Sequence, residues 1–138
     1  MKKYEKIDHT ADIGIRAYGR TTEELFNNAA AGMISLIFGN NLPEPLSDFS
    51  IEIKGDDREE LLVNFLEEIL YHLNVNRFAC TETAVTLIED NYLTAQLKGE
   101  LFNETKHCIH YDIKGVTFHL LKFEKREDML TVQVIFDI

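Results

Sequence analysis

Each end of the chain holds an aspartate that an alternating strand pattern would keep off the core. Successive side chains of a strand face opposite sides, and the apolar positions near the start are Ile13, Ile15 and Ala17. Asp12 therefore lies on the polar side, where this predicted strand begins. Near the other end the apolar positions are Leu130, Val132, Val134 and Phe136. Asp137 is left on the polar side, next to the terminal residue Ile138.

These two aspartates could form a metal site if folding makes their strands neighbours. Asp12, Asp137 and the terminal carboxylate of Ile138 would then supply several hard oxygen ligands, which calcium and magnesium prefer. The alternative is two solvated aspartates at strand ends. The spacing of the residues leaves both readings open.

Other residues that could do chemistry are scattered along the chain. A zinc site would require three histidines to converge, and the alternative is that each one packs or hydrogen-bonds on its own: His9, His107, His110 and His119. Lys114 begins a predicted strand in phase with Val116, and its ordinary role there would be to extend from a sheet edge into solvent. The motifs of self-sufficient catalysis, such as a phosphate-binding glycine loop or a nucleophile elbow, are missing.

The composition is that of one soluble domain covering residues 1–138. The chain has 138 residues, of which 45% are hydrophobic and 28% charged. Its formal net charge of −10 argues against direct RNA binding, because clustered lysine and arginine supply most nucleic-acid affinity. The first residues are followed by no apolar signal region, and no apolar run approaches the roughly 20 residues of a membrane span. We therefore expect a cytoplasmic protein with no membrane segment.

Two amphipathic helices are predicted. Thr21 and Glu24 have the spacing of a capping box, and apolar residues then recur at helical spacing up to Ile37. The acidic run 56–60 opens a second helix, because carboxylates stabilise free amides in the first helical turn. Its apolar stripe extends to Leu73.

The remaining segments alternate with the period of strands. They are the run 49–54, a hairpin around 89–91, and a closing pair made of 113–123 and 129–138. A polar passage separates the hairpin from the closing pair and includes Glu100 and His107. The order strand, helix, strand, helix and then several strands predicts an α+β fold. Two amphipathic helices would stack on one mixed or mostly antiparallel sheet in a two-layer sandwich.

Several of these segments together resemble the archease family. The matching segments are residues 9–15, 61–71, 99–100, 113–119 and 134–138. The chain departs from the usual family pattern at Gly115, where an alanine is common, and at Phe118, where a tyrosine is common. The loss of a hydroxyl at Phe118 would matter if that group made a contact.

The resemblance implies an accessory protein of the GTP-dependent RNA ligase that seals tRNA halves during tRNA splicing. Such a protein promotes guanylylation of the ligase's active-site histidine, supports multiple turnover and broadens nucleotide use, and it meets RNA only through the ligase. The resemblance also implies that Asp12, Asp137 and Ile138 bind a divalent metal, usually calcium. Lys114, His9 and His119 become candidates for contact with the partner's nucleotide site.

Two other classes of function compete with this one. A metal-dependent hydrolase or nuclease would use Asp12, Asp137 and a nearby histidine, but the chain offers few candidate general bases. A general chaperone would suppress aggregation of unrelated proteins, but the residue pattern gives no sign of the exposed apolar surface that this requires.

Overall fold

The structure is a computed structural model that describes residues 2–8 and 12–138. These described residues form two helices and eight strands in two antiparallel sheets, which confirms the α+β class. The helices are α1 (Thr22–Phe38) and α2 (Arg58–Asn74). The strands are β1 (Tyr4–Asp8), β2 (Ile13–Gly19), β3 (Ser47–Lys54), β4 (Phe78–Ile88), β5 (Tyr92–Leu101), β6 (Gly115–Val116), β7 (Lys122–Arg126) and β8 (Met129–Asp137).

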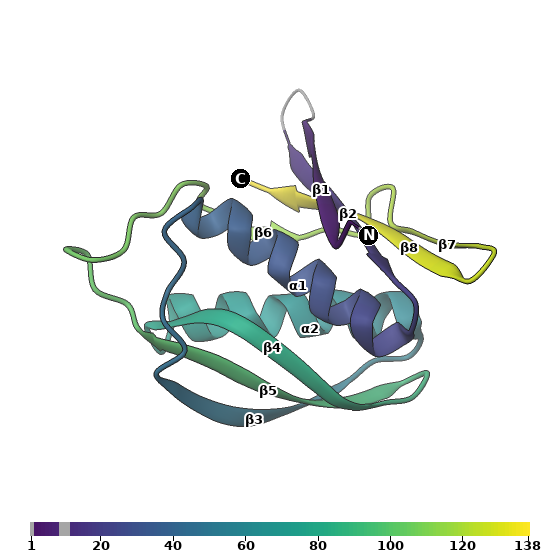
Figure 1. The fold of residues 1–138 in the computed structure, drawn as a ribbon, viewed down its shortest axis with the longest axis horizontal. Helices are drawn as coiled ribbons and strands as arrows, with labels where there is room; N and C mark the ends of the chain where they lie inside the picture. The colour runs from purple at the N-terminus through teal and green to yellow at the C-terminus, as the bar shows by residue number, and fades with distance from the viewer. Residues whose placement is uncertain (1, 9–11) are drawn as a thin grey trace.

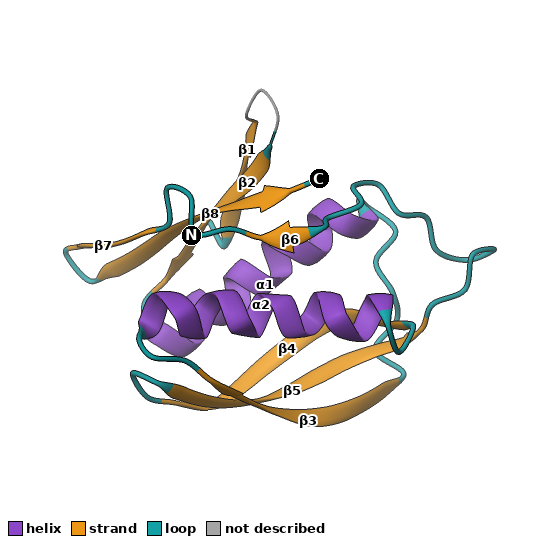
Figure 2. Ribbon diagram, turned by 180° about the vertical axis from the view of Figure 1, so that it is seen from behind, coloured by secondary structure: helices purple, strands orange, loops and turns teal. Residues whose placement is uncertain are grey.

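The layering differs from the prediction of a single sheet. Both helices lie between a five-stranded sheet, in which β1, β2, β8 and β6 follow one another and β7 also pairs with β8, and a three-stranded sheet in the order β3, β5, β4 (Figures 1 and 2). The reason lies in α1, which buries residues around most of its circumference and contacts both β2 and β4. A helix that is apolar on nearly all sides must be covered on both faces.

The helix starts follow the predicted capping chemistry. The Thr21 side chain accepts a hydrogen bond from the Glu24 backbone N–H at 3.1 Å, and the Asp57 side chain accepts one from the Glu60 N–H at 2.8 Å. Each cap satisfies an amide that the first helical turn leaves free. Neither helix in the described part of the chain is long and apolar enough to cross a membrane.

The five-stranded sheet joins the two ends of the chain. β2 pairs antiparallel with β8 from Ile13 opposite Phe136 to Gly19 opposite Leu130. The alternating apolar residues of β2 point into the core and are almost fully buried: Ile13, Ile15 and Ala17. The strand phase predicted from the sequence is confirmed.

The predicted strand 113–123 is wrong, because the chain breaks there into two short strands. β6 pairs with the end of β8 through Val116 opposite Phe136, and β7 pairs with its beginning through Lys122 opposite Gln133. Five residues, 117–121, lie between these two pairings, whereas only two residues of β8, Val134 and Ile135, lie between their partners. The three extra residues have no partners on β8, so this segment leaves the sheet and forms a loop.

Candidate functional site at the end of the five-stranded sheet

The pairing of β2 with β8 brings Asp12 and Asp137 to the same end of the five-stranded sheet. Asp12 directly precedes Ile13, whose partner Phe136 directly precedes Asp137, so the register continues from one aspartate to the other. Asp137 is exposed and Asp12 is partly buried. We call this end of the sheet, defined by Asp12 and Asp137, the acid end.

Two segments distant in sequence flank Asp137. The first segment is β6 with the residue before it: the Lys114 backbone N–H donates to the Asp137 carbonyl at 2.7 Å, and Gly115 pairs with Asp137. The second segment is α2, whose Glu67 carboxylate accepts a hydrogen bond from the Val116 N–H at 2.7 Å. Glu67 fixes β6 beside the acid end. Nothing in the sequence singled it out, because it occupies an ordinary polar position of an amphipathic helix.

The departure from the family pattern at Gly115 leaves this arrangement intact. A Cβ atom at this position would lie 3.6 Å from the Glu67 Oε1 atom and 4.0 Å from the Asp137 Oδ2 atom, which are ordinary contact distances. Either glycine or alanine therefore fits between the two carboxylates.

The donor atoms at the acid end suit a hard cation. Asp12 and Asp137 supply carboxylate oxygens, and Ile138, which is 48% exposed, adds a main-chain oxygen beside Asp137. Oxygen ligands of this kind match calcium or magnesium. Within residues 2–8 and 12–138, no group of three or more His, Cys, Asp or Glu side chains is placed to hold an ion. The remaining ligands would have to come from the chain terminus, water or another molecule.

The other candidate residues divide between this end and the rest of the molecule. Lys114 lies beside Asp137, and its exposed ammonium pairs with Asp112 at 2.8 Å. His119 lies on the exposed loop 117–121, and His9 lies outside the described residues. His107 is buried elsewhere, and the described histidines do not gather into a zinc site.

The polar passage before β6 meets the connection between α1 and β3 in a second cluster, which we call the Glu100 corner and define by Glu44, Glu100, Lys106 and His107. Glu100 accepts from the Glu44 N–H at 2.6 Å, from the Lys106 ammonium at 2.8 Å and from the His107 ring at 3.0 Å. These donors hold its pKa at about 2, with the backbone amide as the largest cause. The sequence placed Glu100 and His107 in one polar passage but did not reveal that their side chains pair.

The contacts of His107 fix its tautomer. The Asn103 backbone N–H donates to the Nδ1 atom at 2.9 Å, so Nδ1 is an acceptor. The hydrogen is therefore on Nε2, which donates to Glu100. His107 is 5% exposed and packs against Phe38 and Phe102. The ring thus joins the polar cluster to the apolar core and is unavailable as a ligand in this state.

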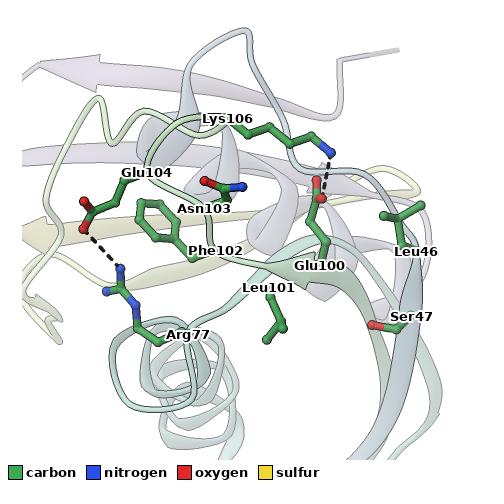
Figure 3. Close-up of a pocket in the computed structure, with 9 residues that line it drawn as sticks. All are labelled: Leu46, Ser47, Arg77, Glu100, Leu101, Phe102, Asn103, Glu104 and Lys106. Carbon is green, nitrogen blue, oxygen red and sulfur yellow. Dashed lines mark hydrogen bonds and ion pairs between the residues drawn. The ribbon is translucent and has the colours of Figure 1, made fainter.

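An open hollow of about 780 Å³ borders the Glu100 corner (Figure 3). Arg77 and Phe102 line it, with the guanidinium 4.5 Å from the ring centroid, and Glu104 lies 3.7 Å from the same guanidinium. The charged groups drawn in Figure 3 thus pair with one another. The charged residues around this hollow are better explained as contacts that stabilise the fold than as a binding site for an external ion.

One protein-family model matches nearly the whole chain. The model of the Archease protein family (MTH1598/TM1083) matches residues 4–138. The chain belongs to the archease family. Archeases are accessory proteins rather than catalysts, so membership implies a protein partner.

Individual archeases match over nearly the whole chain. The chain is 36% identical to Protein archease of Thermococcus kodakarensis over 93% of this chain and 92% of that protein. It is 37% identical to Protein archease of Methanosarcina barkeri over 99% of this chain and 97% of that protein.

Solved structures of the family share the fold. The solution structure of Methanobacterium thermoautotrophicum Protein 1598 superposes with a TM-score of 0.81 and 31% identity over the full length of both chains. The crystal structure of a Thermotoga maritima archease, described as a possible chaperone, has a TM-score of 0.69 at 24% identity, covering 96% of this chain and 94% of that one. The second likeness concerns the fold alone.

Proposed function

We propose that this chain is the accessory protein of a GTP-dependent tRNA-splicing RNA ligase. It promotes guanylylation of the ligase's active-site histidine, allows repeated turnover and broadens the nucleotides that the ligase accepts. The observation that carries the proposal is the register of β2 and β8, which brings Asp12 and Asp137 together at an exposed end. Membership of a family of accessory proteins supplies the partner class.

The acid end acts by entering the ligase's cleft beside the nucleotide. Among the described residues, neither Asp12 nor Asp137 forms an ion pair within the chain. Their charges are therefore available to a ligand outside the fold, whereas a carboxylate paired internally would have to break that pairing first. A cationic nucleotide channel would attract such an end and speed the encounter.

The distribution of charge favours this orientation. Residues 1–20 and 112–138, which hold the five-stranded sheet, contain nine basic and eight acidic residues. Residues 21–111 contain five basic and sixteen acidic residues. The bound RNA would repel this second part, which includes the three-stranded sheet. The nearly neutral five-stranded sheet is therefore the side that can approach the ligase with its RNA.

Asp12, Asp137 and Ile138 would hold a divalent cation, with Ile138 binding through its main-chain or terminal oxygen and calcium as the proposed ion. When bound, such an ion supplies positive charge that neutralises phosphate oxygens. Lys114 lies at the same end, so its ammonium is placed to contact a phosphate once it leaves Asp112. His119 is exposed on the neighbouring loop and is a second candidate contact.

A chaperone role is a second candidate, because several large apolar side chains prove to be exposed although the residue pattern gave no sign of them. The most exposed are Leu46, Val75, Leu101 and Phe118. A chaperone would suppress aggregation of unrelated proteins through such residues. An archease acting on one ligase would leave those proteins unaffected, so a light-scattering assay with a standard aggregating protein separates the two functions.

The test is guanylylation of the ligase over many turnovers with the wild-type chain and with the variants Asp12→Ala and Asp137→Ala. We expect each variant to lose about a hundredfold of the stimulation or more, because loss of a residue that only supports a metal ligand already costs up to about a hundredfold. The control is Asp48→Ala, which removes an exposed aspartate from β3 in the other sheet and should leave stimulation unchanged. Full stimulation by both acid-end variants would disprove the proposal.

A further inference from the structure

The loop 117–121 holds more residues than the stretch of β8 that lies between the partners of β6 and β7. β6 and β7 pair with successive parts of β8, and three of the five residues between them have no opposite position in the ladder. The loop stands out from the five-stranded sheet on the side away from the helices (Figures 1 and 2). The loop therefore carries residues that take no part in the strand pairing of the sheet.

Hydrogen bonds hold the base of this loop in one conformation. The Thr117 hydroxyl donates to the Ile135 carbonyl at 2.9 Å and accepts from the His119 N–H at 3.2 Å. The Gln133 side chain donates to the Leu120 carbonyl at 3.2 Å. Leu120 has φ of 56°, a left-handed conformation that is unfavourable for a leucine. The loop is fixed by its neighbours despite this strain.

The fixed loop presents apolar side chains to solvent. Phe118 is 57% exposed and Leu120 is 49% exposed. Neither side chain belongs to the buried core. An aromatic or aliphatic side chain that enters a pocket is a common anchor at the centre of a protein interface.

The loop adjoins the acid end. Thr117 bonds to Ile135, which lies two residues before Asp137, or about 7 Å along a strand. Ile138, which is 48% exposed, adds a further apolar side chain at the end of β8. The loop is therefore joined to Asp137 through β6, in which Gly115 pairs with Asp137 and Val116 precedes the loop.

We propose that Phe118 and Leu120 anchor this chain on its protein partner, by entering an apolar pocket at the rim of the partner's cationic nucleotide cleft. This inference rests on the proposed function and assigns the partner's contact surface. Because β6 joins Asp137 to the loop, a partner that receives the aspartates in its cleft would lie beside the loop as well. The anchor supplies affinity, and the acid end supplies the effect on guanylylation.

The experiment measures the dissociation constant for the purified ligase and, separately, the stimulation at saturating concentration. The variants are Phe118→Ser and Leu120→Asn. Asparagine tolerates a left-handed backbone better than leucine does, so Leu120→Asn should not lower the thermal stability of the fold. The matched control is Leu101→Asn, which removes a 72% exposed leucine from β5 in the other sheet.

We expect each loop variant to weaken binding at least tenfold while stimulation at saturation stays at the wild-type level, and the Leu101→Asn control to bind normally. Asp137→Ala should show the reverse, with binding retained and stimulation lost. Wild-type affinity in both loop variants would overturn the anchor while leaving the proposed function intact. A wild-type chain that neither binds nor stimulates the ligase would overturn both. Self-association of the wild-type chain that Leu120→Asn abolishes, with unchanged ligase binding, would assign the loop to a second copy and also overturn the anchor.

Discussion

The acid end and the Glu100 corner use the same kind of side chain under opposite conditions. Glu100 is 8% exposed and accepts hydrogen bonds from a backbone amide, a lysine and a histidine of its own chain. Asp137 is exposed, and its side chain has no ion pair within the described residues. A carboxylate that the fold satisfies supports the fold, and one that it leaves unsatisfied is available to a partner. Substitutions should therefore affect stability at the corner and function at the acid end.

The largest effect on stability is expected for His107→Ala. The change leaves the Asn103 N–H without its acceptor, removes one donor from Glu100 and opens a cavity beside Phe38 and Phe102. The free energy of unfolding should fall by about 3 kcal/mol, from unsatisfied polar groups and lost packing together. Urea denaturation measures the loss. An unchanged free energy of unfolding, together with loss of ligase stimulation by the folded variant, would contradict the assignment of stability to the Glu100 corner and function to the acid end.

Gly14→Ala should have the next largest effect, because it disturbs the backbone on which the acid end is built. A Cβ atom at Gly14 would lie 2.6 Å from the Val134 carbonyl oxygen and 2.7 Å from the Ile135 Cδ1 atom, so β8 would have to move. We expect a loss of about 2 kcal/mol, as for other insertions into packed regions. Thermal unfolding followed by circular dichroism gives the value. An unchanged melting temperature would show that β2 and β8 are less tightly paired than described.

Acid should weaken the corner in a defined range of pH. The pKa of Glu100 is about 2 in the fold and ordinarily 4.5. A lowered pKa means that this carboxylate stabilises the fold fully above pH 4.5, and that the contribution is lost as pH falls toward 2. Urea unfolding at pH 7, 4 and 3 should show a steeper loss for the wild type than for Glu100→Gln. The variant retains some acid sensitivity, because the pKa of Glu5 is also about 2, through its bond from the Tyr18 hydroxyl. An equal loss of unfolding free energy with falling pH in the two proteins would contradict a stabilising role for the Glu100 carboxylate.

Gly115→Ala should have the smallest effect, although it lies between two carboxylates. The added methyl group meets only ordinary contacts, and alanine restricts the unfolded chain more than glycine does. We expect a change in unfolding free energy of less than about 1 kcal/mol, in the stabilising direction. Calorimetric unfolding measures it. A marked destabilisation would mean that Glu67 and Asp137 lie closer to β6 than the structure places them.

Local sequence patterns predicted much of the fold, and they predicted that Asp12 and Asp137 lie on the polar side of their strands. The helix starts at Thr21 and Asp57 depend on neighbours three residues away, and the phase of Asp12 and Asp137 depends on simple alternation. Such information is contained in short stretches of sequence, which is why these predictions are confirmed.

The remaining features depend on contacts between distant segments. The second sheet exists because α1 needs cover on both faces, and the loop 117–121 exists because β6 and β7 share the edge of β8. The pairing of Glu100 with His107 crosses a turn whose path no periodicity reveals. The role of Glu67 follows only from where α2 lies against β6.

The most direct test of the account is a double-mutant cycle with Asp12→Asn and Asp137→Asn, read as guanylylation of the ligase over many turnovers. Residues that act on one ligand show strongly non-additive effects. We predict that each single variant loses about a hundredfold of the stimulation and that the double variant loses little more than either one. Two losses that multiply in the double variant would show that Asp12 and Asp137 act independently, and would contradict a shared site at the end of the five-stranded sheet.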